Sequence, residues 1–155
     1  MKKVLVAFLL ASSLIVACSK GNNDLQNFDK TKLVSEVKKA EFQPKLPTQM
    51  PFQVKSTDVS SLGTQKNVMT IMFVGEGGEQ MGLQIVKGNV EYADDLKRET
   101  IKIGSKEGYY VKNDAGAQML NWKDNGISYD LTYFSKQSKK EISKEQLIGV
   151  AESFK

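Results

Sequence analysis

Apolar residues recur with two different periods along this chain, and the change of period separates helical segments from strands. Leu33, Val37 and Ala40 follow one another at spacings of four and three, which is typical of one face of an α-helix. Asp29 precedes this run and is expected to cap the helix by accepting hydrogen bonds from its first free N–H groups. The helix is expected to end before Pro44, because the residue preceding a proline is disfavoured in the α conformation.

A proline-rich connector follows this helix. The only prolines of the chain, Pro44, Pro47 and Pro51, lie close together, which predicts a stiff, extended segment over residues 43–51. The alternative interpretation is a proline-rich ligand for a partner protein, and a structural connector is favoured over it.

Beyond Pro51 the pattern is that of β-strands. Met69, Ile71 and Phe73 share one face of the segment 67–74, and the other face is also apolar. Such a strand is expected to be covered on both sides or to offer an apolar surface. The glycine-rich run 75–78 predicts a hairpin turn rather than a phosphate site, because a strand follows it and not a helix. Strands are expected over residues 52–60, 67–74, 80–87, 101–103 and 109–111, and a polar loop or short helical turn over residues 91–99.

The clearest hairpin lies near the C-terminus. Asn125-Gly126 is the strongest short signal for a two-residue turn, and it places Trp122 opposite Tyr129. Opposed residues share a face of the sheet, so this register separates the hairpin into an apolar and a polar face. The expected apolar face holds Leu120, Trp122, Ile127, Tyr129, Leu131 and Tyr133, and the polar face holds Asn121, Lys123, Ser128, Asp130 and Thr132.

A second helix is expected after this hairpin. Ser143 and Gln146 match a capping box, and an apolar stripe at helical spacing follows from Leu147 to Phe154. A helix, several consecutive strands and a final helix predict an α+β fold. We expect one domain over residues 28–155, with an antiparallel β-meander sheet and both helices packed on one of its faces.

The N-terminus matches an export signal. Lys2 and Lys3 precede an apolar run over residues 4–17, which is shorter than the ~20 residues of a membrane-spanning helix. The run ends in Leu14-Ile15-Val16-Ala17-Cys18, which resembles the lipobox of bacterial lipoproteins. In those proteins diacylglycerol is attached to the Cys sulfur and cleavage makes this Cys the first residue. The alternative is an ordinary signal peptide with an unrelated Cys.

The lipobox resemblance implies both an anchor and a location. Residues 1–17 would be a lipoprotein signal peptide, Cys18 the site of lipid attachment, and residues 18–27 the lipidated Cys with a flexible, polar tether. The partner implied is the membrane, through diacylglycerol on Cys18, and two acyl chains hold a protein stably there. The protein is therefore expected on the extracytoplasmic face of the cell membrane.

Composition removes several functional classes. One Cys and no His leave no disulfide framework, no thiolate metal cluster and no His-dependent catalytic set. Loss of Lys2 and Lys3 with the signal takes the formal net charge from +4 to +2, which gives no case for nucleic-acid binding. Asp94 and Asp95 form an acidic pair, but they lie in a polar loop where carboxylates are solvated. We expect no enzyme, no catalytic residue, no metal and no cofactor.

Several spaced segments in the rest of the chain form a recognisable pattern, over residues 39–42, 44–47, 50–52, 109–111, 120–131 and 143–154. Together they resemble an uncharacterised domain of Gram-positive extracytoplasmic proteins. The last of them also resemble, distantly, LolA-type and RseB-type lipoprotein-binding domains. This resemblance implies binding of acyl chains or lipoproteins and transfers no catalytic residue.

These observations favour a non-catalytic binding or accessory module for a lipid, a lipoprotein or an envelope protein. The alternatives are a structural or regulatory subunit of a membrane complex and, less favoured, a hydrolase. Tyr110 and Phe134 fall opposite the expected core residues of their strands, and we expect them to point outward toward a partner. An apolar cavity of several hundred Å³ would favour an acyl ligand, whereas an exposed aromatic patch would favour a protein partner. The expected strands also contain four methionines, Met69, Met72, Met81 and Met119. Their adaptable thioethers suit either a protein core or a binding groove, and the core is the favoured interpretation.

Overall fold

The computed structural model describes residues 24–61, 66–92 and 97–155. The expected signal peptide, Cys18 and the Asp94–Asp95 pair lie outside these ranges. The described elements, in chain order, are β1 (Gln26–Asn27), α1 (Thr31–Val37), β2 (Gln49–Met50), β3 (Val54–Ser61), β4 (Val68–Gly75), β5 (Gln80–Lys87), β6 (Glu99–Ile103), β7 (Lys106–Lys112), β8 (Gln118–Asp124), β9 (Ile127–Tyr133) and α2 (Lys144–Glu152).

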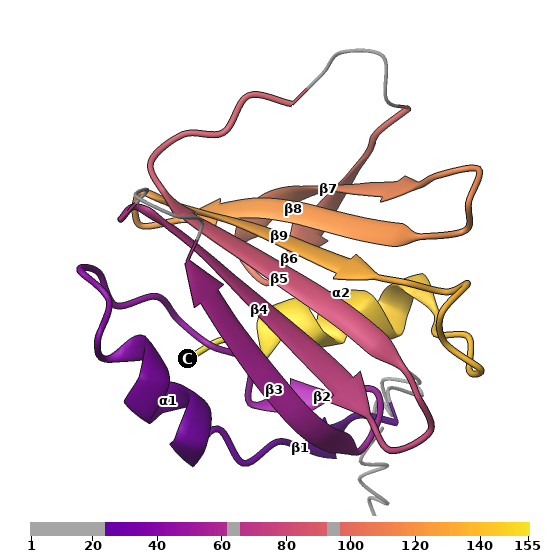
Figure 1. The fold of residues 1–155 in the computed structure, drawn as a ribbon. Helices are drawn as coiled ribbons and strands as arrows, with labels where there is room; N and C mark the ends of the chain where they lie inside the picture. Colours follow the sequence, from indigo (N-terminus) through magenta and orange to yellow (C-terminus); the bar gives the residue numbers. More distant parts are fainter. Residues whose placement is uncertain (1–23, 62–65, 93–96) are drawn as a thin grey trace, which may run out of the picture.

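Strands β3 to β9 form one seven-stranded antiparallel sheet in the order β3-β4-β5-β9-β8-β7-β6 (Figure 1). Two meanders, β3-β4-β5 and β6-β7-β8-β9, meet where β5 pairs with β9. Every other neighbouring pair is consecutive in the chain, so the expected meander is confirmed with this one non-consecutive contact. The link from β5 to β6 therefore has to cross from the middle of the sheet to its far edge.

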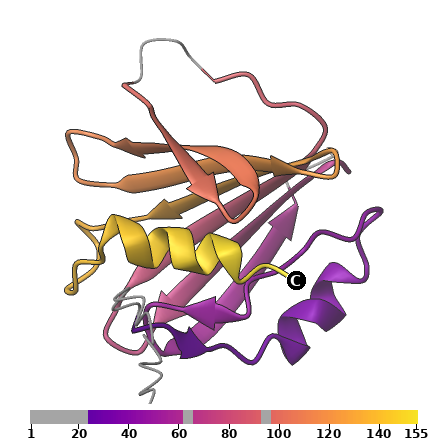
Figure 2. The same cartoon turned by 180° about the vertical axis from the view of Figure 1, so that it is seen from behind.

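Both helices lie on the same face of the sheet, as the view from behind shows (Figure 2). Leu33 and Val37 of α1 and Leu147 of α2 belong to a single buried core cluster with the inward residues of the strands. This confirms the α+β class with an N-terminal and a C-terminal helix on one face. Among the residues in the described ranges, no helix is long and apolar enough to cross a membrane.

The N-terminal segment differs in detail from the expectation. Helix α1 begins at Thr31 and ends at Val37, well before Pro44, and Ala40 lies beyond it. Lys30 holds the cap position, although the Asp29 carboxylate still accepts hydrogen bonds from the Thr31 N–H, at 3.0 Å, and from its hydroxyl. The last part of the expected tether is also ordered, because β1 pairs with β2 in a small second sheet.

The connector over residues 43–51 is extended, and the end of the chain holds it in place. The backbones of Leu46 and Lys155 exchange two hydrogen bonds. The Ser153 hydroxyl accepts hydrogen bonds from the N–H groups of Thr48 and Gln49, and Thr48 Oγ1 donates to the Ser153 carbonyl at 2.8 Å. The prolines thus stiffen a segment in which the N–H groups of Leu46, Thr48 and Gln49 find partners beyond α2.

The β8–β9 hairpin has the register that the sequence predicts. Trp122 lies opposite Tyr129, and Asn125 and Gly126 both have positive φ values, 50° and 77°, as their two-residue turn requires. The predicted capping box of α2 is also present, because Ser143 Oγ accepts from the Gln146 N–H and Gln146 Oε1 accepts from the Ser143 N–H. Phe154 then packs edge-on against Trp122 and Tyr129, with ring centroids 5.0 Å and 5.5 Å away.

The β6–β7 hairpin is tighter than expected. The sequence analysis left residues 104–108 between two strands, but β6 ends at Ile103 and β7 already begins at Lys106. Gly108 therefore lies inside β7, opposite Trp122 of β8. A Cβ added to Gly108 would lie 2.8 Å from Ile103 Cδ1 and 2.9 Å from the Asn121 carbonyl oxygen. Only glycine fits this close approach.

Candidate binding surface

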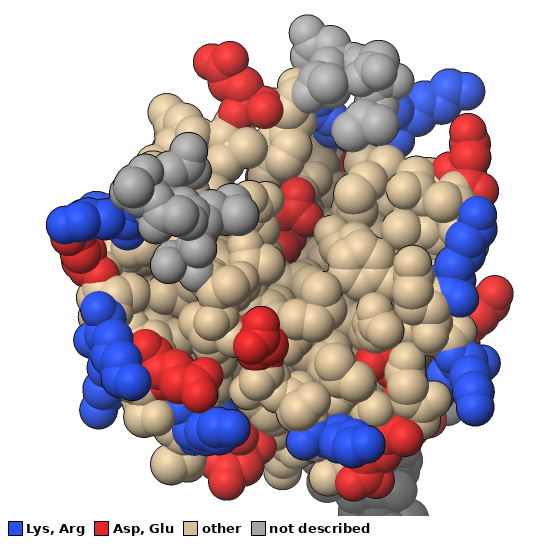
Figure 3. Space-filling model, in the orientation of Figure 1, with Lys and Arg blue, Asp and Glu red and all other residues tan. Residues whose placement is uncertain are grey.

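The two faces of the seven-stranded sheet have different surroundings. One face packs on the helices, and the opposite face, here called the open face, is turned toward the viewer in Figure 3. Lysine and arginine side chains lie around the rim of the open face, whereas its middle carries mostly uncharged side chains and a few acidic ones (Figure 3). A sheet with one uncovered face of this kind has a surface available for binding.

Apolar side chains lie together on the open face of β4, β5 and the end of β9. Met72 lies opposite Gly82 in the strand register. A Cβ on Gly82 would lie 3.2 Å from Phe134 Cε2 and 3.8 Å from Met72 Cε, so both side chains border the space above this glycine. Val74 follows Met72 on the same face of β4 and is half-buried. We call Met72, Val74, Gly82 and Phe134 the apolar patch.

The methionines of the strands divide between the two faces. Met69 and Met81 are 5% and 0% exposed and belong to the core cluster. Met72 and Met119 are half-buried on the open face, where Met119 lies opposite Thr132. The core interpretation thus holds for two of the four thioethers, and the other two lie where a partner can reach them.

A polar cluster lies beside the apolar patch, on β8 and β9. Asn121 is 6% exposed, and its amide donates to Asp130 Oδ2 at 2.7 Å, while Thr132 Oγ1 donates to Asp130 Oδ1 at 3.0 Å. Burial raises the pKa of Asp130, and these two hydrogen bonds oppose the shift without cancelling it. The cluster is therefore a partly desolvated carboxylate held between two fixed donors.

A surface cleft of about 320 Å³ adjoins this cluster, where the described parts of the link between β5 and β6, residues 88–92 and 97–98, lie against the open face. Tyr92 and Arg98 of the link line one side, and the Arg98 guanidinium carbon lies 5.4 Å from the centroid of the Tyr92 ring. Tyr109 of β7 and Asn121 of β8 line the sheet side. Tyr109 is 37% exposed, and it is the one large hydrophobic side chain that is exposed in the described ranges.

The Tyr92 phenol is held over the sheet. Its hydroxyl lies close enough to the Asn121 amide for this amide to lower the pKa of the phenol. Burial and the nearby Asp130 charge raise the pKa of Tyr92 to about 12, against opposing effects of Arg98 and Asn121. The phenol therefore keeps its proton at any physiological pH and remains a hydrogen-bond donor.

The two aromatic residues expected to point outward lie on different faces. Phe134 is on the open face, within the apolar patch. Tyr110 lies opposite Leu120 on the helix-covered face and packs against the core, so its expected outward direction is wrong. Its hydroxyl donates to Gln118 Oε1 at 2.9 Å, and Lys144 Nζ of α2 lies 5.6 Å from its ring centroid. Its neighbour Tyr109 points outward instead, because it lies opposite Asn121 on the open face.

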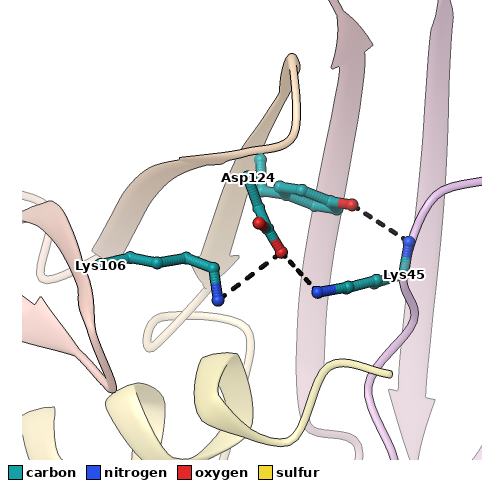
Figure 4. Close-up of polar contacts among 4 residues, drawn as sticks. Lys45, Lys106 and Asp124 are labelled. Atoms are coloured by element: carbon teal, nitrogen blue, oxygen red, sulfur yellow. Dashed lines mark hydrogen bonds and ion pairs between the residues drawn. The ribbon is translucent and has the colours of Figure 1, made fainter.

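Asp124, at the start of the last hairpin turn, links three parts of the fold (Figure 4). Its Oδ2 atom lies 2.8 Å from Lys45 Nζ of the connector and 3.6 Å from Lys106 Nζ of β7. The Tyr129 hydroxyl accepts a hydrogen bond from the Lys45 backbone N–H at 3.0 Å. Burial by itself raises the pKa of Asp124, but the hydrogen bond from Lys45 and the charge of Lys106 outweigh it and lower the pKa. These groups pair with one another, so the arrangement fastens the connector to the sheet.

One buried carboxylate lacks such a partner. Glu79, at the end of the glycine-rich turn, is 8% exposed, and its Oε2 atom has no hydrogen-bond partner in the described part of the chain. The carboxylate occupies the space above Gly75 and Gly77, where added Cβ atoms would lie 2.2 Å and 2.8 Å from its oxygens. The described residues hold no group of three or more Cys, Asp or Glu side chains arranged to bind a metal ion.

Another cleft, of about 370 Å³, lies between the end of α1 and the strands β3 and β4. Phe42, Val59 and Met69 give it an apolar floor, and Lys39 and Lys66 lie at its edge. Lys66 Nζ is 2.7 Å from Glu41 Oε1, so one of these cations is already paired. The cleft opens to the surface and does not enclose a chain-shaped cavity.

Comparison with known proteins identifies a family without an assigned role. The family model described as a domain of unknown function, DUF4367, matches residues 46–154. The chain belongs to this family. No curated protein and no solved structure matches the chain. The match begins within the connector and spans the whole seven-stranded sheet and α2, so the open face and its cleft lie within the DUF4367 domain.

The residues of the cleft were not recognisable as a group from the sequence. Tyr92 and Arg98 lie in a segment that the sequence marks only as polar, and its path over the open face follows from the crossing between β5 and β6. Asn121 and Asp130 were placed on the polar face of the last hairpin, and the register confirms that they lie opposite each other. The signal that could have pointed to them is this pairing of an amide with a carboxylate in the middle of a sheet.

Proposed function

We propose that this DUF4367 protein is a membrane-anchored extracytoplasmic lipoprotein whose domain is a non-catalytic binding module for an envelope component. The lipobox-like segment ending in Cys18, the only Cys, supports the anchor. The distant likeness of the chain's ending to LolA-type and RseB-type domains supports a lipid, a lipoprotein or an envelope protein as the partner.

The observation that carries the binding role is the apolar patch on the open face. Met72, Val74 and Phe134 are half-buried side chains on a sheet face that neither of the two described helices covers. Apolar residues on an uncovered face, bordered by polar ones, are typical of interaction surfaces. Because the patch is a surface and the two clefts described above open to solvent, an envelope protein suits this geometry better than an acyl chain enclosed in a cavity.

In-cell photo-crosslinking tests the binding face. A photoreactive residue at Gln84, which is exposed on the open face, is expected to give a defined adduct that mass spectrometry identifies as one envelope component. The matched control places the same residue at Glu145, which is exposed on α2. Phe134→Lys is expected to remove the adduct at position 84 because it puts a charge into the apolar patch. Equal adducts from both positions, or none from position 84, would contradict the proposal.

Membrane fractionation tests the anchor separately. Cys18→Ala removes the sulfur to which diacylglycerol is joined, so the variant is expected to leave the membrane fraction or to retain residues 1–17. Unchanged fractionation together with an unchanged mass would contradict lipid attachment at Cys18.

A further inference from the structure

The cleft beside the polar cluster differs in chemistry from the apolar patch. Two phenol rings, Tyr92 and Tyr109, line it together with Asn121, which lies opposite Tyr109 in the sheet. Its volume of about 320 Å³ falls at the lower end of the range for small-ligand sites. The apolar patch has no comparable set of hydrogen-bonding groups.

The polar groups of the cleft are fixed before any ligand arrives. Asn121 is buried, is held by Asp130 and lies close to the Tyr92 phenol. Ser128 Oγ donates to the Gly88 carbonyl at 2.7 Å, and Lys123 Nζ donates to Asn89 Oδ1. Side chains that are already oriented lose little conformational entropy on binding. This smaller entropic cost favours the binding of a ligand.

Among the described residues of the cleft, the formal charges balance. Arg98 and Lys123 contribute two positive charges, while Glu107 at the edge and Asp130 behind Asn121 contribute two negative ones. A site without net charge gives no advantage to a phosphate or a carboxylate ligand, and it favours a neutral ligand rich in hydrogen-bonding groups.

Tyr109 supplies an apolar platform beside these polar groups. Its ring is 37% exposed, and its hydroxyl lies 3.4 Å from Glu107 Oε1, at the far limit of a hydrogen bond. A tyrosine offers an apolar ring face together with a polar tip. A sugar ring has the matching form, because C–H groups cover its faces and hydroxyls, each a donor and an acceptor, surround its edge.

We propose that the cleft formed by Tyr92, Tyr109 and Asn121 binds a neutral saccharide unit, stacked on Tyr109 and hydrogen-bonded to Asn121 and the Tyr92 phenol. This site goes beyond the proposed function, because neither its ligand class nor its residues belong to the apolar patch. The weak contact of Tyr109 with Glu107 leaves its ring free to adjust to the sugar.

The test uses the full-length chain, labelled with ¹⁵N, and two neutral probes. Chitotriose carries acetamido groups and maltotriose carries only hydroxyls, and each is titrated to about 10 mM while amide shifts are recorded. Saturable shifts at Tyr109, Asn121 and their neighbours are expected for at least one of the two saccharides. Inorganic phosphate, titrated in the same way, is the anionic control and is expected to give no saturable shift at these residues.

Two variants make the result specific. Tyr109→Ala is expected to weaken saccharide binding at least about tenfold, and because this side chain is exposed the fold is expected to survive, as Trp122 fluorescence will check. Glu145→Ala, which is exposed on α2 and lies outside both the cleft and the apolar patch, is expected to bind as the natural chain does. No saturable binding of either saccharide, equal weakening by both variants, or preferential binding of phosphate would each overturn the inference. The crosslink from position 84 does not depend on Tyr109, so its persistence or loss tests the proposed function independently.

Discussion

Gly108→Ala provides the sharpest test of the packing that positions the open face. Gly108 lies where β6, β7 and β8 approach most closely, and an added Cβ would lie 2.8 Å from Ile103 Cδ1 and 2.9 Å from the Asn121 carbonyl oxygen. Carbon atoms normally approach to about 3.5–4.0 Å, so the first contact overlaps by at least about 0.7 Å. The Ile103 side chain can turn away, but the Asn121 carbonyl is part of β8, which is paired on both sides.

The expected cost follows from these contacts. Overpacking of a rigid site destabilises by about 1–3 kcal/mol, and the contact with backbone places this site at the upper end. Replacing a strand glycine by alanine returns about 0.5–1 kcal/mol of conformational entropy. We therefore expect the free energy of unfolding to fall by about 2 kcal/mol, a large part of the ~5–15 kcal/mol typical of a domain.

Urea unfolding of the purified chain, followed by the fluorescence of Trp122, measures this cost, because the single Trp is 6% exposed and lies opposite Gly108. Gly82→Ala is the matched control. Its Cβ would meet only side-chain atoms, Phe134 Cε2 at 3.2 Å being the nearest, and the Phe134 ring can shift on the open face. The reasoning is refuted if Gly108→Ala is as stable as Gly82→Ala. Adding Ile103→Val should recover only the part of the cost that comes from the Ile103 Cδ1 contact, as a double-mutant cycle would measure.

Three further substitutions test other parts of the fold by the same unfolding assay. Asp124→Asn should cost about 1 kcal/mol at pH 7, a modest amount because Lys45 and Lys106 are partly exposed. The pKa of Asp124 is lowered in the folded state, so the stability difference between the natural chain and the variant should persist at pH values above the ordinary pKa of 3.8 and vanish as the pH falls below it. A stability difference that stays constant with pH would contradict the ion pairing. Leu147→Ala should cost about 2–5 kcal/mol because the side chain is fully buried under the sheet, and a cost below about 1 kcal/mol would mean that α2 is not packed there. Glu79→Gln should leave the stability unchanged or raise it, because it removes a buried charge whose Oε2 atom has no partner in the described part of the chain, whereas a clear loss would reveal a partner for this oxygen.

Local signals in the sequence were enough to predict the last hairpin and the last helix. Asn125-Gly126 sets the hairpin register and Ser143 with Gln146 sets the helix start, because both depend only on neighbouring residues. The pairing of β5 with β9 was not predicted, since it joins residues 40 to 52 positions apart and no local pattern specifies it. The direction of Tyr110 differs from the expectation because the pairing of β7 with β8 puts it opposite the core residue Leu120, and the short run 109–111 does not specify which of its faces is covered.

The same long-range pairing also explains why the candidate binding surfaces escaped sequence analysis. Placing β9 beside β5 brings Phe134 over Gly82 and sets Asp130 in the middle of the sheet, so the apolar patch and the polar cluster both arise from this contact. It also forces the chain to cross from β5 to the far edge at β6, which carries Tyr92 over Asn121. The polar face of a hairpin, which usually is only a solvated surface, here becomes the floor of a cleft. If the saccharide and crosslinking experiments both succeed, one pairing of strands will account for the two binding surfaces of this domain.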